Sequence, residues 1–230
     1  TSSGDPLVVF AIPLISRERS GDWTQVCANL AATLDSLRAQ TSPAWRAFVC
    51  GQDRPDGVGF EEGRIDFVPF RGRTRFYDKG DKRLALIDAA LRACRERDGY
   101  YAQWDADDLL HPEAVAHVVA GDNLRGYLVT RGYVADMASG FIAPLGPGPD
   151  EGRRPFWQSC GSSAFVRFDF RSQPRLWRAS LRRITSTCSG SHVAECSCAY
   201  TSATCGPSVG SGNTWLLLTR KRLSRLAPHV

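Results

Sequence analysis

Three carboxylates, Asp105, Asp107 and Asp108, stand within a stretch of four residues. Like charges this close repel one another, so the sequence predicts a positive partner, most simply a hard divalent cation bound through oxygen. Residues 100–104 are mostly aromatic or apolar, as in a buried strand, and Pro112 favours a helix start. Ligands bind at the C-terminal ends of strands in α/β sheets. A capped strand-to-helix turn is the alternative interpretation, since Asp caps helices well.

The composition fits one large globular domain, with 230 residues, 43% of them hydrophobic and 23% charged. No apolar run approaches the roughly 18 residues of a membrane span. Residues 1–4 lack the layout of a signal peptide, so we expect a cytoplasmic protein whose eight cysteines are thiols. The net charge of +5 arises in residues 169–230, which hold nine basic and two acidic side chains. These arginines are scattered and form no recognisable binding module, so no nucleic-acid partner is expected.

Apolar periodicity and turn residues predict strands that alternate with helices. Strands are expected at residues 7–13, 45–50, 65–68, 100–104 and about 127–134. One helix follows Asp22, with an apolar stripe of Val26, Leu30, Leu34 and Leu37, and a second follows Gly80, with a stripe of Leu84, Ile87, Leu91 and Cys94. A third helix is expected at about 112–120, and a mobile loop at 139–157. This order predicts a doubly wound α/β fold, with the ends of the first, second and fourth strands at one edge of the sheet.

Five motifs in this order resemble those of one enzyme family. Residues 12–18 are similar to its first strand and nucleotide-contacting loop, and residues 36–45 to its "SLLAQTYPN" segment. Residues 80–91 are similar to its "GK...ALNAGL" segment, residues 104–112 to "LDADDxLxP", and residues 161–165 to a small-residue motif. The first 170 residues therefore resemble the GT-A nucleotide-sugar glycosyltransferases, especially the large inverting family that builds polysaccharides and glycoconjugates.

The resemblance implies a fold, an activity and a site. The fold would be a mixed, mostly parallel sheet with helices on both faces: a nucleotide-sugar-binding core at 1–170 and an acceptor-side segment at 171–230, in a single domain. The activity would be transfer of a sugar, with inversion, from a nucleotide sugar, with UDP as the expected nucleotide. The acceptor, a glycan, a lipid or a small molecule, is not identified. Manganese or magnesium would be held by Asp107 and Asp105. The nucleotide would contact Pro13, Leu14, Ser16, Arg17, Glu18, Gln52, Asp53, Lys82, Arg83, Asp105 and Ala106, and the acceptor side would include Gly161, Ser162 and Ser163.

Two departures from the family pattern affect this hypothesis. Gln52, with Asp53 beside it, stands where the family has its uracil-binding Asp, and an amide can both accept from uracil N3–H and donate to O4. The acidic pair that would supply the catalytic base is missing, which leaves Asp169 and Glu195 as candidates. The alternatives are a nucleotidyltransferase of similar architecture and a catalytically inactive nucleotide-binding protein. Residues 14–20 lack the glycine- and lysine-rich loop typical of a nucleotidyltransferase.

The tail differs in character from the rest of the chain. Residues 185–213 are mostly Ser, Thr, Gly, Ala and Cys, without an amphipathic period. Four cysteines lie there, but they lack the closely paired spacing of a zinc site. His192 is either a late metal ligand or a surface histidine. We expect a tail that is disordered as written, or a natural protein whose sequence differs there because of a frameshift.

Overall fold

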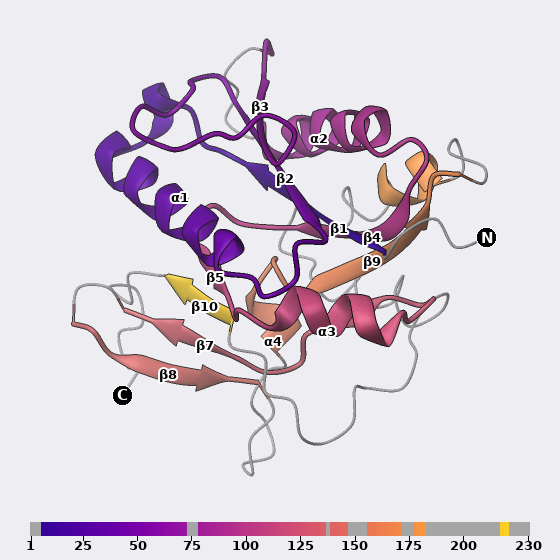
Figure 1. The fold of residues 1–230 in the computed structure, drawn as a ribbon. Helices are drawn as coiled ribbons and strands as arrows, with labels where there is room; N and C mark the ends of the chain where they lie inside the picture. Colours follow the sequence, from indigo (N-terminus) through magenta and orange to yellow (C-terminus); the bar gives the residue numbers. More distant parts are fainter. Residues whose placement is uncertain are drawn as a thin grey trace.

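The computed structural model describes residues 6–72, 78–136, 139–146, 156–171, 177–182 and 217–220. Its main sheet has six strands in the order β3-β2-β1-β4-β9-β6 (Figure 1). The pairs β3–β2, β2–β1 and β1–β4 are parallel, and β9 runs antiparallel to both of its neighbours. The bounds of these strands are Leu7–Pro13 for β1, Trp45–Gly51 for β2, Ile65–Pro69 for β3, Asp98–Gln103 for β4, Tyr127–Leu128 for β6 and Ala164–Asp169 for β9.

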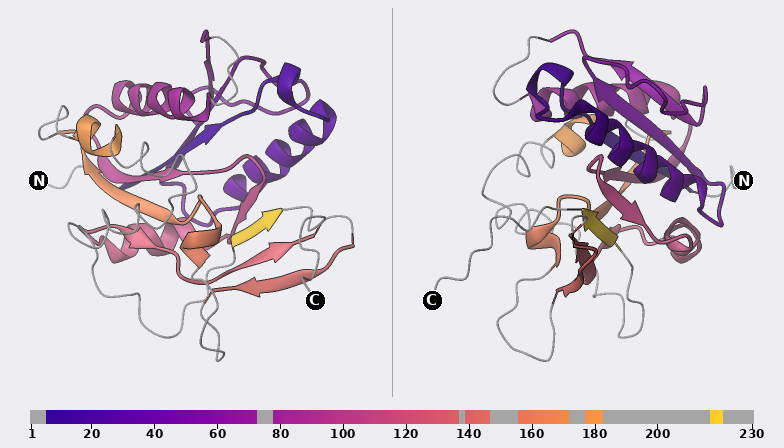
Figure 2. Two further views of the ribbon diagram at one scale, coloured as in Figure 1. Left: turned by 180° about the vertical axis from the view of Figure 1, so that it is seen from behind. Right: turned by 90° about the vertical axis from the view of Figure 1, so that its left-hand side faces the viewer.

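Helices cover both faces of this sheet (Figure 2). On one face, Val8, Phe10 and Ile12 of β1 belong to a core with α1, α3 and α4. On the other face, Leu7, Val9 and Ala11 of β1 belong to a core with α2 and the helix at 177–182. The helix bounds are Trp23–Arg38 for α1, Lys79–Ala93 for α2, Ala114–Gly121 for α3 and Phe156–Ser159 for α4. The predicted α/β class, with a mixed, mostly parallel sheet and helices on both faces, is confirmed.

Local signals explain the N-terminal half of the fold. Every residue of β1 is buried, as the continuous apolar run predicts for a central parallel strand. Asp22 caps α1 by accepting a hydrogen bond from the backbone N–H of Gln25 at 3.0 Å. The predicted apolar stripe of α1 is buried at Leu30, Leu34 and Leu37.

The buried face of α2 differs from the predicted one. The expected stripe included Leu84 and Leu91, but both are only partly buried. The buried residues of α2 are Lys82, Arg83, Leu86, Ile87, Ala89 and Ala90. Ile87 and Cys94 of the predicted stripe are buried, and Leu84 and Leu91 pack against the same core. The inner face is therefore wider than predicted, since it also includes two cationic residues that a hydrophobic pattern places in solvent.

A second, smaller sheet has the strand order β5-β10-β7-β8. Its strands are Asp108–Leu110, Leu217–Arg220, Gly132–Ala135 and Ile142–Leu145, respectively. This sheet corrects two predictions. The expected strand at 127–134 is divided between β6 of the main sheet and β7 of the small one, and β8 lies inside the segment expected to be a loop. An apolar run indicates burial but does not identify the strand that pairs with it. Here β6 pairs with β9 and β7 with β10, both distant in sequence, and β7 also pairs with the nearby β8.

The start of α3 and the tail also differ from the predictions. Helix α3 begins at Ala114, so Pro112 precedes the helix and does not occupy its first position. Residues 177–182 form a helix and Leu217–Arg220 form β10, between β5 and β7. The tail therefore contributes secondary structure at these two segments, and the predicted disorder of residues 185–213 stays a prediction. Glu195, His192 and all of residues 185–213 lie outside the described residues. None of the described helices has the length and apolar character needed to cross a membrane.

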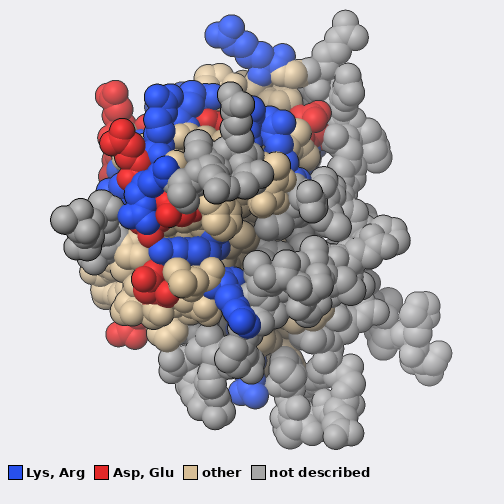
Figure 3. All heavy atoms as spheres, turned by 90° about the vertical axis from the view of Figure 1, so that its right-hand side faces the viewer, with Lys and Arg blue, Asp and Glu red and all other residues tan. Residues whose placement is uncertain are grey.

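Basic residues near residues 177–182 are paired with carboxylates. Arg178 contacts Asp88 of α2 at 2.7 Å and Arg182 contacts the same carboxylate at 3.5 Å. The hydrogen bonds from Arg178 hold the pKa of Asp88 below its ordinary value. Figure 3 shows the face on the right of Figure 1, where acidic side chains lie among the basic ones. In the part of this face that the structure describes, the positive charge is broken up by carboxylates.

Candidate functional site

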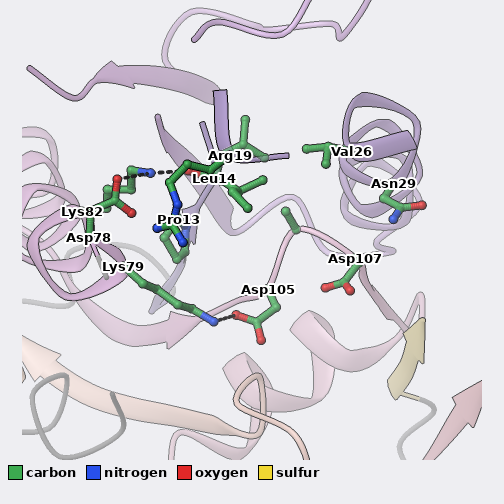
Figure 4. Close-up of a pocket in the computed structure, with 12 residues that line it drawn as sticks. Pro13, Leu14, Arg19, Val26, Asn29, Asp78, Lys79, Lys82, Asp105 and Asp107 are labelled. Atoms are coloured by element: carbon green, nitrogen blue, oxygen red, sulfur yellow. Dashed lines mark hydrogen bonds and ion pairs between the residues drawn. The ribbon is translucent and has the colours of Figure 1, made fainter. Parts of the chain in front are cut away.

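A cavity of about 410 Å³ lies at the C-terminal ends of β1 and β4 (Figure 4). These two strands are neighbours, and the chain continues from β1 toward β2 on the other side, so the cavity is at a topological switch point of the sheet. The lining residues come from the ends of both strands and the loops that follow them, from α1 and from the start of α2. They are Pro13, Leu14, Ile15, Arg19, Val26, Asn29, Asp78, Lys79, Lys82, Asp105, Ala106 and Asp107.

The loop that carries Asp105, Ala106 and Asp107 is fixed from two sides. The backbone N–H of Asp105 donates to Ser162 Oγ at 2.7 Å. The carbonyl of Ala106 accepts from Thr33 Oγ1 of α1 at 3.0 Å. Ser162 and Thr33 are both fully buried, so water does not compete for the hydrogen bonds that fix the loop.

Gln40 connects the end of α1 to the segment that follows the carboxylates. Its Nε2 donates to the carbonyls of His111, at 2.8 Å, and Ser36, at 3.1 Å. Its Oε1 accepts from the backbone N–H of Val115 at 3.0 Å. Thr41 N–H donates to the Pro112 carbonyl at 2.9 Å. Two of the sequence motifs, 36–45 and 104–112, are therefore hydrogen-bonded to each other.

The three carboxylates of the motif have different surroundings. Asp105 Oδ1 is 2.7 Å from Lys79 Nζ, and Asp107 lines the cavity on the side of α1 (Figure 4). Asp108 is fully buried, and its Oδ2 accepts from Cys160 Sγ at 3.4 Å. Burial, together with the nearby charges of Asp105 and Asp107, raises the pKa of Asp108 to about 7, against an opposing hydrogen bond from Ser162. Asp108 therefore supports the loop and does not face the cavity.

Lys82 belongs to a buried polar network at the back of the cavity. Its Nζ donates to the Leu14 carbonyl at 2.7 Å and lies 3.0 Å from Asp78 Oδ2. Asp78 Oδ2 also accepts from Gln52 Nε2 at 2.6 Å. Gln52 Oε1 is buried and has no hydrogen-bond partner among the described residues. Lys82 thus lines the cavity, as expected of a nucleotide contact, but its ammonium also holds the end of β1 in place.

Several predicted nucleotide contacts lie beside the cavity without lining it. Arg17 and Glu18 belong to the exposed 3-10 helix η1, Arg17–Arg19, and Ser16 just before it is buried. The backbone N–H of Arg17 donates to Asp53 Oδ2 at 2.7 Å, which ties the loop after β1 to the loop after β2. Gln52 and Arg83 are likewise not among the lining residues.

Sequence reasoning missed half of the lining residues. Ile15, Arg19, Val26, Asn29, Asp78 and Lys79 were not predicted as site residues. Val26 and Asn29 lie three apart on α1, a spacing that places them on one face, and Asp78 and Lys79 directly precede the 80–91 motif. The helical spacing and the nearness to a motif could have suggested these residues from the sequence. A motif match alone, however, does not show which of its neighbouring side chains face the cavity.

The acceptor-side motif lies against the carboxylate loop. A Cβ on Gly161 would be 3.5 Å from Asp105 Oδ2, and Ser162 binds the Asp105 backbone. The Ser163 carbonyl accepts from the Val129 N–H at 2.7 Å, which anchors this loop to the segment after β6. Residues 161–163 therefore lie beside the carboxylate loop, and their assignment to the acceptor side stays a prediction.

Asp169 is not part of this site. It pairs in register with Asp98 at the start of β4, so it lies at the opposite edge of the sheet from the cavity. The reason is that β9 is antiparallel to β4, and its C-terminal end lies beside the N-terminal end of that strand. The Asp169 carboxylate accepts from Arg171 Nε at 2.9 Å. The proposal of Asp169 as the catalytic base does not fit the structure.

The carboxylates fit a cation whose remaining ligands come from a substrate. Asp105 and Asp107 line one cavity. Magnesium is commonly held by one or two carboxylates together with substrate phosphates and water. No group of three or more His, Cys, Asp or Glu side chains within the described residues could hold a metal ion. Asp105 and Asp107 are the two carboxylates that would be available to such a cation.

No protein-family model matches the chain, and no curated protein sequence matches it. Among solved structures, S. aureus TarS is similar over 93% of this chain and 36% of its own length, with 12% identity and a TM-score of 0.49. A 4-diphosphocytidyl-2C-methyl-D-erythritol synthase is similar over 94% of this chain and 89% of its own, with 13% identity and a TM-score of 0.49. A glycosyltransferase involved in glycosylation of the major capsid of PBCV-1 is similar over 79% and 67%, with 8% identity and a TM-score of 0.38. These identities and TM-scores are too low to assign an activity.

Proposed function

We propose that this chain is a metal-dependent glycosyltransferase that moves a sugar from a nucleotide sugar to an acceptor. One observation carries the proposal: the cavity at the ends of β1 and β4 combines the carboxylates of Asp105 and Asp107 with the cations of Arg19, Lys79 and Lys82. A diphosphate needs positive charge, and a divalent cation needs oxygen ligands. The five motifs that resemble GT-A glycosyltransferases support the same assignment.

The lining residues suggest how the donor is held. Asp105 and Asp107 would hold manganese or magnesium, which when bound stabilises the charge that builds on the leaving nucleoside diphosphate. Lys79 and Arg19 add positive charge from the side chains that line the cavity. The buried Lys82 contributes a fixed positive charge at the end of β1. The fixed backbone of the 105–107 loop pre-organises the carboxylates, so little reorganisation is needed when the donor binds.

UDP is the nucleotide that we propose, on the basis of Gln52. This side chain stands at the end of β2, and its Nε2 is hydrogen-bonded to Asp78, which lines the cavity. Gln52 does not line the cavity, but its buried Oε1 lacks a partner among the described residues, so it would accept from the N3–H of a uracil that reaches it beside the cavity. Inversion by direct displacement is part of the proposal, with Glu195 as the candidate base that remains after Asp169 is set aside.

The test is donor binding by an Asp107→Ala variant. We expect calorimetry with UDP and Mn²⁺ to show metal-dependent binding in the wild type and its loss in the variant, with an unchanged melting temperature. Glu62→Ala removes an exposed carboxylate outside the cavity and serves as the control. Unchanged affinity in Asp107→Ala would refute the metal assignment. A wild type that neither binds nor turns over any nucleotide sugar in a panel of donors would refute the proposed function.

A further inference from the structure

One ion pair in the cavity spans residues that no motif connects. Lys79 Nζ lies 2.7 Å from Asp105 Oδ1, and both residues line the cavity. Figure 4 shows the Lys79 side chain extending from α2 to the carboxylate. A divalent cation that binds Asp105 competes with this ammonium for the same carboxylate, because two positive charges cannot share one oxygen without repulsion. The metal site and Lys79 are therefore coupled.

The position of Lys79 is unfavourable for the helix itself. Lys79 is the first residue of α2, where the helix dipole is positive and a cation is destabilising. Asp78 precedes it but makes no side-chain capping hydrogen bond, because its carboxylate is engaged by Lys82 and Gln52. Arg19 and Lys82 bring further positive charge to the same cavity. Local rules that are broken at a cavity commonly mark a functional position.

Lys79 and Lys82 lie three residues apart on α2 but differ in their freedom to move. The Lys82 side chain is 1% exposed and bonded to both a carbonyl and a carboxylate. The Lys79 side chain is 42% exposed and its Asp105 partner is 31% exposed. An ion pair this exposed contributes little to stability, and lysine is a compact charge on a flexible four-carbon stem. The Lys79–Asp105 pair can therefore open at low cost, whereas the Lys82 contacts cannot.

We infer that Lys79 is an exchangeable counter-ion of Asp105. It neutralises the carboxylate, releases it to the divalent cation that enters with the donor, and then binds the terminal phosphate of the nucleoside diphosphate. The second step rests on the proposed function. The Lys79 ammonium moves from the carboxylate to the phosphate as the divalent cation takes its place at Asp105. The negative charge of Asp105 is therefore compensated throughout the exchange.

The experiment compares wild type, Lys79→Met, Lys79→Arg and Arg92→Met. Arg92 is exposed near the end of α2 and lies outside the cavity. Arg92→Met is the control for Lys79→Met, because both variants remove one positive charge from the same helix. Binding of Mn²⁺ alone, followed by the electron paramagnetic resonance signal of the free ion, is expected to be roughly two- to fivefold tighter in Lys79→Met. At saturating Mn²⁺, affinity for UDP should fall roughly tenfold while affinity for UMP stays unchanged. Lys79→Arg should retain most of the UDP affinity, and Arg92→Met should resemble wild type.

Each arm can overturn one part of the inference. Mn²⁺ affinity that is unchanged or weaker in Lys79→Met would show that the ammonium does not compete for Asp105. An equal loss of UDP and UMP affinity would show that Lys79 shapes the site without contacting the terminal phosphate. A wild type that binds no nucleoside diphosphate would overturn the phosphate step together with the proposed function. The Mn²⁺ titration would still decide the counter-ion step.

Discussion

Replacing Lys82 with Met should destabilise the fold far more than replacing Lys79 with Met. The Lys82 ammonium is buried, donates to the Leu14 carbonyl at 2.7 Å and lies 3.0 Å from Asp78. Met is similar in length to Lys, so the main loss is electrostatic. The Asp78 side chain, which is 10% exposed, keeps its charge and its hydrogen bond from Gln52 but loses the Lys82 ammonium. Removing one member of a buried ion pair costs about 3–5 kcal/mol in the free energy of unfolding.

Lys79→Met is the variant with which the loss of stability in Lys82→Met is compared. Its pair with Asp105 is 42% and 31% exposed on the two sides, so solvent screens it. Such exposed pairs contribute about 0–1 kcal/mol. The two variants remove the same type of side chain from the first residues of one helix. The difference in their stabilities therefore reflects burial, together with the relief of the unfavourable dipole interaction at Lys79.

Urea unfolding followed by circular dichroism would test the prediction, with the slope of each transition compared to confirm two-state behaviour. The double variant Asp78→Asn/Lys82→Met should recover part of the lost stability, because a neutral amide leaves no uncompensated charge in the interior. A loss below about 1 kcal/mol in Lys82→Met, or a loss no greater than that of Lys79→Met, would refute the reasoning.

Two further predictions concern the nucleotide and the frame of the site. With Mn²⁺ present, UDP should raise the melting temperature more than GDP does, because Gln52 Oε1, which has no hydrogen-bond partner among the described residues, suits a pyrimidine. Equal stabilisation by the two nucleotides in a thermal-shift series would remove that role. Gln40→Met should lower the free energy of unfolding by about 1–3 kcal/mol, because the buried Val115 N–H would lose its acceptor. Chemical denaturation would measure this loss, and a stability equal to wild type would contradict a stabilising role for the Gln40 hydrogen bond to the start of α3.

The features predicted correctly from sequence depend on neighbouring residues. The burial of β1 follows from its continuous apolar run, and the start of α1 from Asp22 three residues before the N–H that it caps. The carboxylates of Asp105 and Asp107 were placed at the end of a strand because the residues before them fit a buried strand. Parallel strands present their C-terminal ends at one edge, so the location of the cavity also followed from the predicted order of elements.

Only the tertiary structure decided what each charged side chain of the site contacts. Asp107 and Asp108 are adjacent, yet one lines the cavity and the other is buried against Cys160, a residue from the loop before β9. Lys79 meets Asp105 across 26 positions of sequence. Asp169 lies far from the cavity because β9 runs antiparallel to β4. Sequence patterns report local propensity and burial, whereas the partner of a charge depends on which distant segments pack together, and that is fixed only when the whole sheet has formed.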